Sequence, residues 1–126
     1  MKAKLIKRFF IWSEKPFELA KWYEEMLGLK RDFELNLPDD TGVSLSAPQG
    51  GLIWIGYHDK VKGKNKDPYR FMVSFVVDSV KEVYEEMKKN KVKFVAKPFL
   101  TPTKDKYCAT FMDPEGNVMQ IFSDNP

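Results

Sequence analysis

The sequence predicts an α+β protein built of two βαβββ modules in tandem. Three observations support this prediction: the tetrapeptide Tyr-Glu-Glu-Met occurs twice, each copy lies in a stretch with helical apolar spacing, and strand-like segments flank both copies in the same order. We expect module 1 at residues 1–57, module 2 at residues 68–126 and a basic linker at residues 58–67. A chain of 126 residues, 43% of them hydrophobic, is long enough to form a single domain with a core.

Each predicted helix carries one apolar stripe. The stripes follow i, i+3, i+4 and i+7 spacing, which places their side chains on one helix face. They consist of Leu19, Trp22, Tyr23 and Met26 in the first helix and of Val80, Val83, Tyr84 and Met87 in the second.

Signals for helix ends bound both stripes. Pro16 suits a first helical turn, and Gly28 suits a left-handed cap at the carboxyl end. Ser79 followed by Glu82 forms a capping-box pattern, and we expect Asn90 to take the same left-handed role as Gly28.

Strand-like segments surround each helix. "LIKRFFIW" precedes the first helix and "KRDFEL", "GVSLSA" and "GLIWIGY" follow it, while the second helix has "YRFMVSFVV" before it and "VKFVAKP", "KYCATFM" and "NVMQIF" after it. Related turns at residues 47–50 and 113–116 join the last two strands of each module, and the second has the aspartate, proline and glycine spacing of a type I turn. A single helix leaves one sheet face uncovered, so the modules must pack together or curl into a shared surface.

This organisation, with "WYEEMLGLK" in the first half and "FMDPEGNVMQIF" at the end, resembles the vicinal oxygen chelate superfamily. That superfamily includes glyoxalases, bleomycin-resistance proteins, extradiol dioxygenases and methylmalonyl-CoA epimerase, and the resemblance runs from about Leu5 to Phe122. It implies a curved mixed-sheet cup with the helices outside. It also implies that the protein forms a homodimer.

Enzymes of this family hold a metal with residues from the first and last strand of each half. The resemblance places Arg8, Trp54, Met72 and Gln120 at these positions. Only Gln120 offers an oxygen donor to a hard divalent cation, and a shift of one or two residues along the first strands supplies no better set. We therefore expect no metal, no cofactor and no catalytic residue of the usual kind.

The single histidine and the single cysteine do not replace the missing ligands. His58 lies beside Asp59 at the start of the lysine-rich linker, where a surface position is favoured over a metal ligand. Cys108 lies within a predicted strand, where a small buried apolar role is favoured over a nucleophile.

Strand alternation predicts which side chains fill the cup instead. Phe10 and Trp12 share the face of Arg8, whereas Phe9 and Ile11 point toward the helix. An aromatic surface with few polar groups is typical of a small-molecule pocket, although packing of the aromatic residues against one another is the alternative. The predicted ligand-binding residues are Arg8, Phe10, Trp12, Trp54, Met72, Ser74, Gln120 and Phe122.

Arg8 needs a partner because a guanidinium facing an aromatic enclosure is costly when unpaired. The candidates are Glu14, Asp113, an aromatic face, and the carboxylate or phosphate of a ligand.

The leading hypothesis is a metal-independent small-molecule-binding protein, comparable to the bleomycin-resistance members, that holds a planar or apolar ligand. One alternative is an enzyme of glyoxalase, epimerase or dioxygenase type with ligands from elsewhere, such as Glu14, Glu34 or Asp59. The other is a non-catalytic regulatory or structural module.

Charge and hydropathy exclude other partners. The net charge is +3, and the lysines that gather at positions 60, 62, 64 and 66 indicate a solvated linker more than a phosphate-binding patch. We expect no nucleic-acid partner. The absence of a long apolar run predicts a soluble, cytoplasmic protein with no membrane partner.

Overall fold

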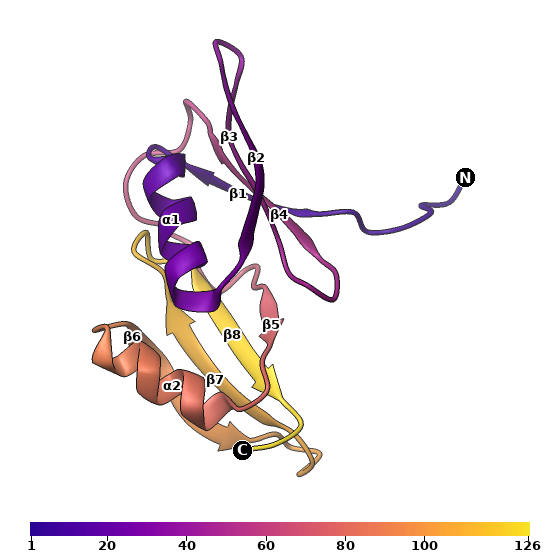
Figure 1. Ribbon diagram of the computed structural model, residues 1–126, viewed down its shortest axis with the longest axis vertical. Helices are drawn as coiled ribbons and strands as arrows, with labels where there is room; N and C mark the ends of the chain where they lie inside the picture. The colour runs from indigo at the N-terminus through magenta and orange to yellow at the C-terminus, as the bar shows by residue number, and fades with distance from the viewer. The chain divides into compact units, whose positions relative to one another are not determined.

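The computed structural model describes residues 1–126, and the chain divides into two compact units, Met1–Gly63 and Lys64–Pro126. Each unit is a four-stranded mixed sheet with one helix (Figure 1). The predicted α+β class with two βαβββ modules is therefore confirmed. The boundary between the units falls inside the stretch predicted to be a linker.

The first unit contains β1 (Phe9–Ser13), α1 (Pro16–Leu27), β2 (Lys30–Leu37), β3 (Asp40–Ser46) and β4 (Leu52–Tyr57). The strand order is β1-β4-β3-β2, with β1 parallel to β4 and the other pairs antiparallel. The strands β1 and β2 therefore form the two edges of this sheet.

The second unit repeats this arrangement with β5 (Ser74–Val76), α2 (Val80–Lys89), β6 (Lys93–Leu100), β7 (Tyr107–Met112) and β8 (Val118–Ser123). Its strand order is β5-β8-β7-β6, and β5 is parallel to β8. The two halves thus share one topology, as the repeated tetrapeptide predicts.

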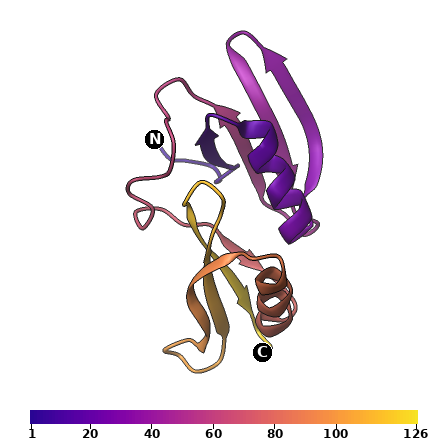
Figure 2. The ribbon, with the colours of Figure 1, turned by 90° about the vertical axis from the view of Figure 1, so that its left-hand side faces the viewer.

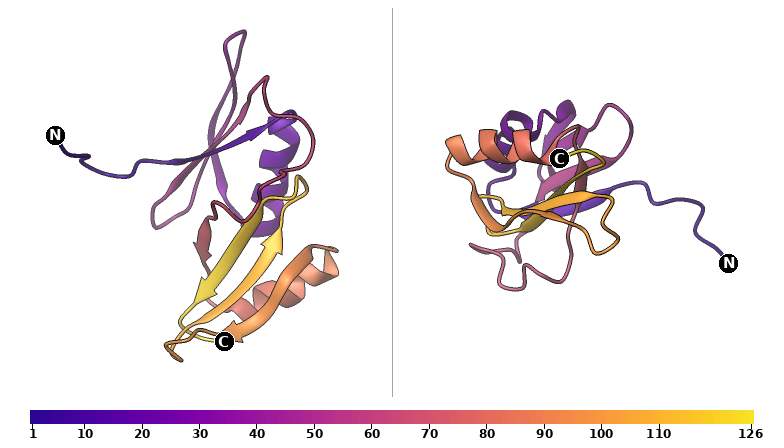
Figure 3. Two further views of the ribbon diagram at one scale, coloured as in Figure 1. Left: turned by 180° about the vertical axis from the view of Figure 1, so that it is seen from behind. Right: turned by 90° about the horizontal axis from the view of Figure 1, so that it is seen from below.

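Each helix covers one face of its own sheet, and that face holds the core of the unit (Figures 2 and 3). We call the opposite face the helix-free face. Buried side chains of the first core are Ile11, Leu19, Ala20, Tyr23, Val43, Leu45, Ile53 and Ile55, and those of the second core are Val80, Met87, Ala109, Phe111, Met119 and Ile121.

Three of the predicted helix ends are confirmed. Pro16 is the first residue of α1, and Gly28 ends this helix with a left-handed φ of 65°, its N–H donating to the Glu24 carbonyl. At the start of α2, the Ser79 hydroxyl accepts a hydrogen bond of 3.1 Å from the Glu82 N–H. These bonds satisfy backbone groups that a helix leaves unpaired at its ends.

The prediction that Asn90 adopts a left-handed conformation is wrong. Asn90 has a φ of −89°, and the left-handed residue is Lys91, with a φ of 63°. The Asn90 side-chain amide donates to the Glu86 carbonyl at 3.0 Å, so this residue caps the helix from a right-handed conformation. The chain then reverses one residue later, where the Val92 N–H donates to the Met87 carbonyl at 3.0 Å.

Both predicted turns between the last strands form. The Gly50 N–H donates to the Ala47 carbonyl at 3.1 Å, and the Gly116 N–H donates to the Asp113 carbonyl at 3.0 Å. The buried Asp113 carboxylate also accepts from the Glu115 N–H at 2.8 Å and from the Asn117 N–H at 3.0 Å. This network fixes the start of β8.

The first strand of each unit is shorter than predicted. β1 begins at Phe9, and β5 covers three residues. Residues 1–7 before β1 are exposed, with Leu5 at 70% and Ile6 at 98%. Neither helix of the fold is long and apolar enough to cross a membrane.

Candidate functional site

The helix-free face of the first unit is aromatic. Strand pairing places Phe10 of β1 beside Trp54 of β4, and Trp12 beside Gly56. Gly42 of β3 lies on the other side of Gly56. We call Phe10, Trp12 and Trp54 the aromatic face.

Two glycines make room for the Trp54 indole. A Cβ atom on Gly56 would lie 2.3 Å from Trp54 Nε1, and one on Gly42 would lie 2.7 Å from Trp54 Cζ2. Neither glycine has a positive φ, so the requirement is for space and not for backbone freedom. Trp54 is only 4% exposed, so its indole forms the buried base of the aromatic face.

Phe10 and Trp12 are the accessible members of the aromatic face. Their rings stack with centroids 5.5 Å apart and an interplanar angle of 27°. Phe10 is 48% exposed and Trp12 is 40% exposed, so both offer ring surface to a ligand. The His58 imidazole packs edge-on against Trp12, with ring centroids 5.3 Å apart.

Arg8 lies directly before β1 and is half-buried. Its Nε is buried without a hydrogen-bond partner, and no ion pair of the structure includes this residue. Of its predicted partners, Glu14 instead accepts from the Gly63 N–H at 2.6 Å and lies 4.0 Å from Lys62. The Arg8 guanidinium is thus left with a charge and donors that a ligand anion could use.

The helix-free face of the second unit is more polar at the corresponding position. Ser74 pairs with Gln120 as Phe10 pairs with Trp54, so the two units share one register. The Ser74 hydroxyl donates to Gln120 Oε1 at 2.6 Å, which leaves the amide N–H groups of Gln120 as donors.

The other two predicted site residues of the second unit flank this pair. Met72 is 47% exposed and lies two residues before Ser74. Phe122 is half-buried. It lies two residues beyond Gln120 on β8, so the two side chains point to the same face of the sheet.

The residues that the resemblance places at metal-ligand positions do not fit a hard divalent cation. The only oxygen donor among them, Gln120 Oε1, already accepts the hydrogen bond from Ser74. Arg8 is cationic, the indole of Trp54 has no lone pair to give, and the Met72 thioether suits soft metals. No group of three or more histidine, cysteine, aspartate or glutamate side chains lies together elsewhere in the chain.

The acids that could serve an alternative enzyme lie in separate places with partners of their own. Glu34 is 2.7 Å from Arg31, and Asp59 is 80% exposed with its carboxylate 3.4 Å from His58 Nδ1. Glu14 binds the backbone of the loop at Gly63. None of the three belongs to a cluster of histidine, cysteine, aspartate or glutamate side chains that could hold a metal ion.

Cys108 is buried at 3% exposure. Burial raises the pKa of its thiol, because the thiolate would lose its hydration. A raised pKa disfavours the nucleophilic form, which agrees with the small apolar role expected from the sequence.

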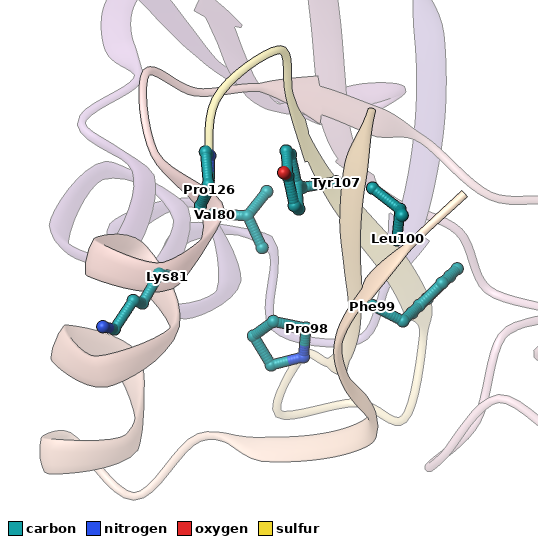
Figure 4. Close-up of a pocket in the computed structure, with 7 residues that line it drawn as sticks. All are labelled: Val80, Lys81, Pro98, Phe99, Leu100, Tyr107 and Pro126. Atoms are coloured by element: carbon teal, nitrogen blue, oxygen red, sulfur yellow. The ribbon is translucent and has the colours of Figure 1, made fainter. Parts of the chain in front are cut away.

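A pocket of about 250 Å³ lies in the second unit, where the start of α2 approaches β6 and β7 (Figure 4). Its lining is mainly apolar and includes none of the predicted site residues. The Lys81 ammonium points away from the other side chains (Figure 4). The pocket is lined by Val80, Lys81, Pro98, Phe99, Leu100, Tyr107 and Pro126.

Two features of the site are missing from the sequence prediction. The first is Gly42, which the sequence prediction does not include, although a glycine within a strand often marks the close approach of another group. Phe33 of β2 lies 6.1 Å from the Trp54 ring centroid and extends the aromatic surface. Its contribution depends on the β2–β3 register, which is shifted between Arg31 and Phe33.

A family model described as Glyoxalase/Bleomycin resistance protein/Dioxygenase superfamily matches residues 5–121. The chain therefore belongs to this superfamily, as the sequence resemblance indicates. No curated protein matches the sequence.

Solved structures share the fold at low sequence identity. A glyoxylase/bleomycin resistance protein/dioxygenase domain from Frankia sp. EAN1pec has a TM-score of 0.80 and 17% identity, covering 98% of this chain and 100% of its own. A trypanothione-dependent glyoxalase I from Leishmania major has a TM-score of 0.77 and 20% identity, covering 97% and 88%. A lactoylglutathione lyase from Agrobacterium tumefaciens has a TM-score of 0.70 and 14% identity, covering 98% and 96%.

Proposed function

We propose that this protein binds a planar, largely apolar small molecule on the aromatic face of its first unit, without a metal ion. The observation that carries this proposal is the stacked pair Phe10 and Trp12, which stays about half exposed above a fixed Trp54. Large exposed aromatic side chains are unfavourable in water, and a rigid pair loses little conformational entropy when a ring stacks on it.

Arg8 gives the proposed ligand its polar end. Its buried, unpartnered Nε lies one residue before β1, and Phe10 follows two residues later. An anionic group such as a carboxylate, sulfonate or phosphate would satisfy this guanidinium. We therefore propose a ligand with a flat apolar body and an acidic substituent.

In the second unit, Met72, Ser74, Gln120 and Phe122 stay predicted ligand-binding residues. The support for them is the free N–H donors of the Gln120 amide beside a half-buried aromatic ring. A homodimeric state likewise stays a prediction.

Two fluorescent probes test this function: anilinonaphthalene sulfonate, which is anionic, and phenylnaphthylamine, which is neutral. Replacing Trp12 by alanine should weaken both by about 1–3 kcal/mol, roughly 5- to 150-fold, because a stacked indole is lost. The change Trp54→Ala should weaken both by a similar amount because it removes the floor of the site. The change Arg8→Gln should weaken the sulfonate more than the neutral probe.

A matched control is Tyr69→Ala, which removes an aromatic side chain that is 71% exposed and lies outside the aromatic face. It should leave both affinities unchanged. Treatment of the wild-type protein with a chelator should also change neither affinity. Equal losses in the Trp12 and Tyr69 variants would show that the probes bind any exposed ring, and the proposed site would be wrong.

A further inference from the structure

The only histidine of the chain packs against the aromatic face. His58 directly follows β4, which runs parallel to β1 and pairs Gly56 with Trp12. Because His58 lies two residues beyond Gly56, it continues the alternation that puts Trp12 on the helix-free face. The two rings meet edge-on with centroids 5.3 Å apart, and the His58 side chain stays 40% exposed. A ligand stacked on Trp12 would therefore lie beside an accessible imidazole.

The hydrogen bonds of His58 leave one of its ring nitrogens free. Nδ1 accepts a hydrogen bond of 3.1 Å from the Lys60 N–H, so the neutral ring carries its proton on Nε2. No hydrogen bond or ion pair of the structure uses Nε2. The imidazole thus offers an N–H donor to a group that binds beside Trp12.

Few charged groups surround this imidazole. Asp59 Oδ1 lies 3.4 Å from Nδ1, and Lys60 meets the ring through its backbone N–H. On the side of β1 the contact is with the uncharged Trp12. Histidine is the side chain whose charge ordinarily changes between pH 5 and 8, so protonation would add a cation at the rim of the aromatic face.

The acid that follows β1 is already engaged elsewhere. Glu14 accepts a hydrogen bond of 2.6 Å from the Gly63 N–H and lies 4.0 Å from Lys62. Asp59 is placed to accept from Nδ1 once that nitrogen is protonated. Nε2 therefore stays free for a ligand in both states of the ring.

We propose that His58 is a second anion-binding group of the aromatic face, so that the preferred ligand carries an acidic group at each end of its flat body. This inference rests on the proposed function, which assigns one acidic group to Arg8. Arg8 and Trp12 are four residues apart, which in an extended chain separates their backbones by roughly 13 Å. One small acidic group cannot contact both Arg8 and His58, whereas a flat body with an acid at either end can.

The same arrangement makes the binding of the second acidic group depend on pH. A protonated imidazole donates a charge-assisted hydrogen bond from Nε2, and such bonds are about twice as strong as neutral ones. The affinity for a ligand with two acidic groups therefore rises as the pH falls through the range in which histidine gains its charge.

Two probes of fixed charge test this inference: naphthalene-2-sulfonate, with one acidic group, and naphthalene-2,6-disulfonate, with two. Calorimetric titration in low-salt buffer at about pH 7.5 and about pH 5.5 gives their dissociation constants on either side of the histidine range. In the wild-type protein the disulfonate should bind at least about threefold more tightly at the lower pH. The monosulfonate should gain less, because Arg8 satisfies its one acidic group at both pH values.

The change His58→Gln removes the titrating ring and keeps a side-chain acceptor for the Lys60 N–H. It should abolish the gain in disulfonate affinity at low pH. The matched control is Lys60→Gln, which removes a cation of the same loop and keeps the backbone N–H that bonds His58. Lysine stays charged across this pH range, so the gain should persist in the Lys60 variant.

An equal gain in the wild-type protein and the His58→Gln variant would overturn the inference. So would the absence of a gain in the wild type, or its loss in the Lys60→Gln variant. The proposed function is judged separately, by the binding of naphthalene-2-sulfonate at the higher pH. Binding that Trp12→Ala does not weaken would overturn the proposed function and the inference together, whereas Trp12-dependent binding without a response to His58→Gln would overturn the inference alone.

Discussion

The glycine beneath Trp54 gives the sharpest test of how the aromatic face is built. In the change Gly56→Ala, the new Cβ would lie 2.3 Å from Trp54 Nε1 and 2.9 Å from Trp12 Cζ3. Both distances are below van der Waals contact, so the indole rings must move. Overpacking of this kind costs about 1–3 kcal/mol.

A smaller effect acts in the opposite direction. Alanine restricts the unfolded chain more than glycine does, which stabilises the fold by about 0.4–1 kcal/mol at a position with ordinary backbone angles. We therefore expect a net loss of about 1–2 kcal/mol in the free energy of unfolding. For a chain of this size, that loss lowers Tm by about 3–8 °C.

Urea unfolding and near-ultraviolet circular dichroism check this prediction, because a displaced indole changes both stability and the aromatic signal. The control is the same glycine change in a Trp54→Leu background, where the bulky ring is absent and the cost of Gly56→Ala should fall by at least about half. A Gly56→Ala variant as stable as the wild type would refute the close packing of Trp54. An equal cost in both backgrounds would show that Trp54 is not its cause.

Other expected outcomes concern stability and reactivity. Replacing Asp113 by alanine should lower the free energy of unfolding in urea by about 2–4 kcal/mol, because a buried carboxylate that accepts backbone hydrogen bonds is lost. A loss below about 0.5 kcal/mol would contradict this role. The Cys108 thiol should react slowly with an aromatic disulfide reagent at about pH 8 and rapidly after unfolding, because burial raises the pKa of this thiol. Equal reaction rates in the folded and unfolded protein would contradict the burial. The Glu24 carboxylate accepts a hydrogen bond from Arg31 and raises the pKa of the Arg31 guanidinium, with Glu34 as a second partner. Glu24→Gln should therefore destabilise the fold more than Glu34→Gln, each by less than about 1 kcal/mol. The reverse order would contradict this ranking.

The module architecture could be predicted from the sequence because local signals agree with the final packing. The apolar stripes, the proline at the start of α1 and the left-handed Gly28 act within a few residues, so they can be recognised without knowledge of the fold. The turn at Asp113 was recognisable for the same reason. Its side chain bonds its own backbone neighbours at 2.8 and 3.0 Å.

Features that depend on several strands were harder to predict. The near-complete burial of Trp54 requires Gly42 of one strand and Gly56 of another beneath a single ring, and that depends on the pairing register. The end of α2 differs from the prediction because the Asn90 side chain satisfies a helix carbonyl and the left-handed conformation falls at Lys91. Composition alone does not reveal which of two adjacent residues reverses the chain.

The sequence predicts an earlier start of β1 than the structure shows, for a related reason. The alternation of lysine with apolar residues before Phe9 is typical of a strand, but those residues have no neighbouring strand in the structure. A strand pattern describes what a segment can pair with, and the partner has to come from elsewhere.

Metal-independent binding is tested most directly by the metal content of the purified protein, measured by elemental analysis after dialysis against zinc, nickel, manganese and iron(II) in turn. The residues that the resemblance places at ligand positions provide one amide oxygen, and that oxygen already accepts a hydrogen bond from Ser74. We expect a content far below one metal ion per chain for every metal, with unchanged binding of phenylnaphthylamine. About one tightly held ion per chain, with probe affinity that depends on it, would contradict metal-independent binding at the aromatic face.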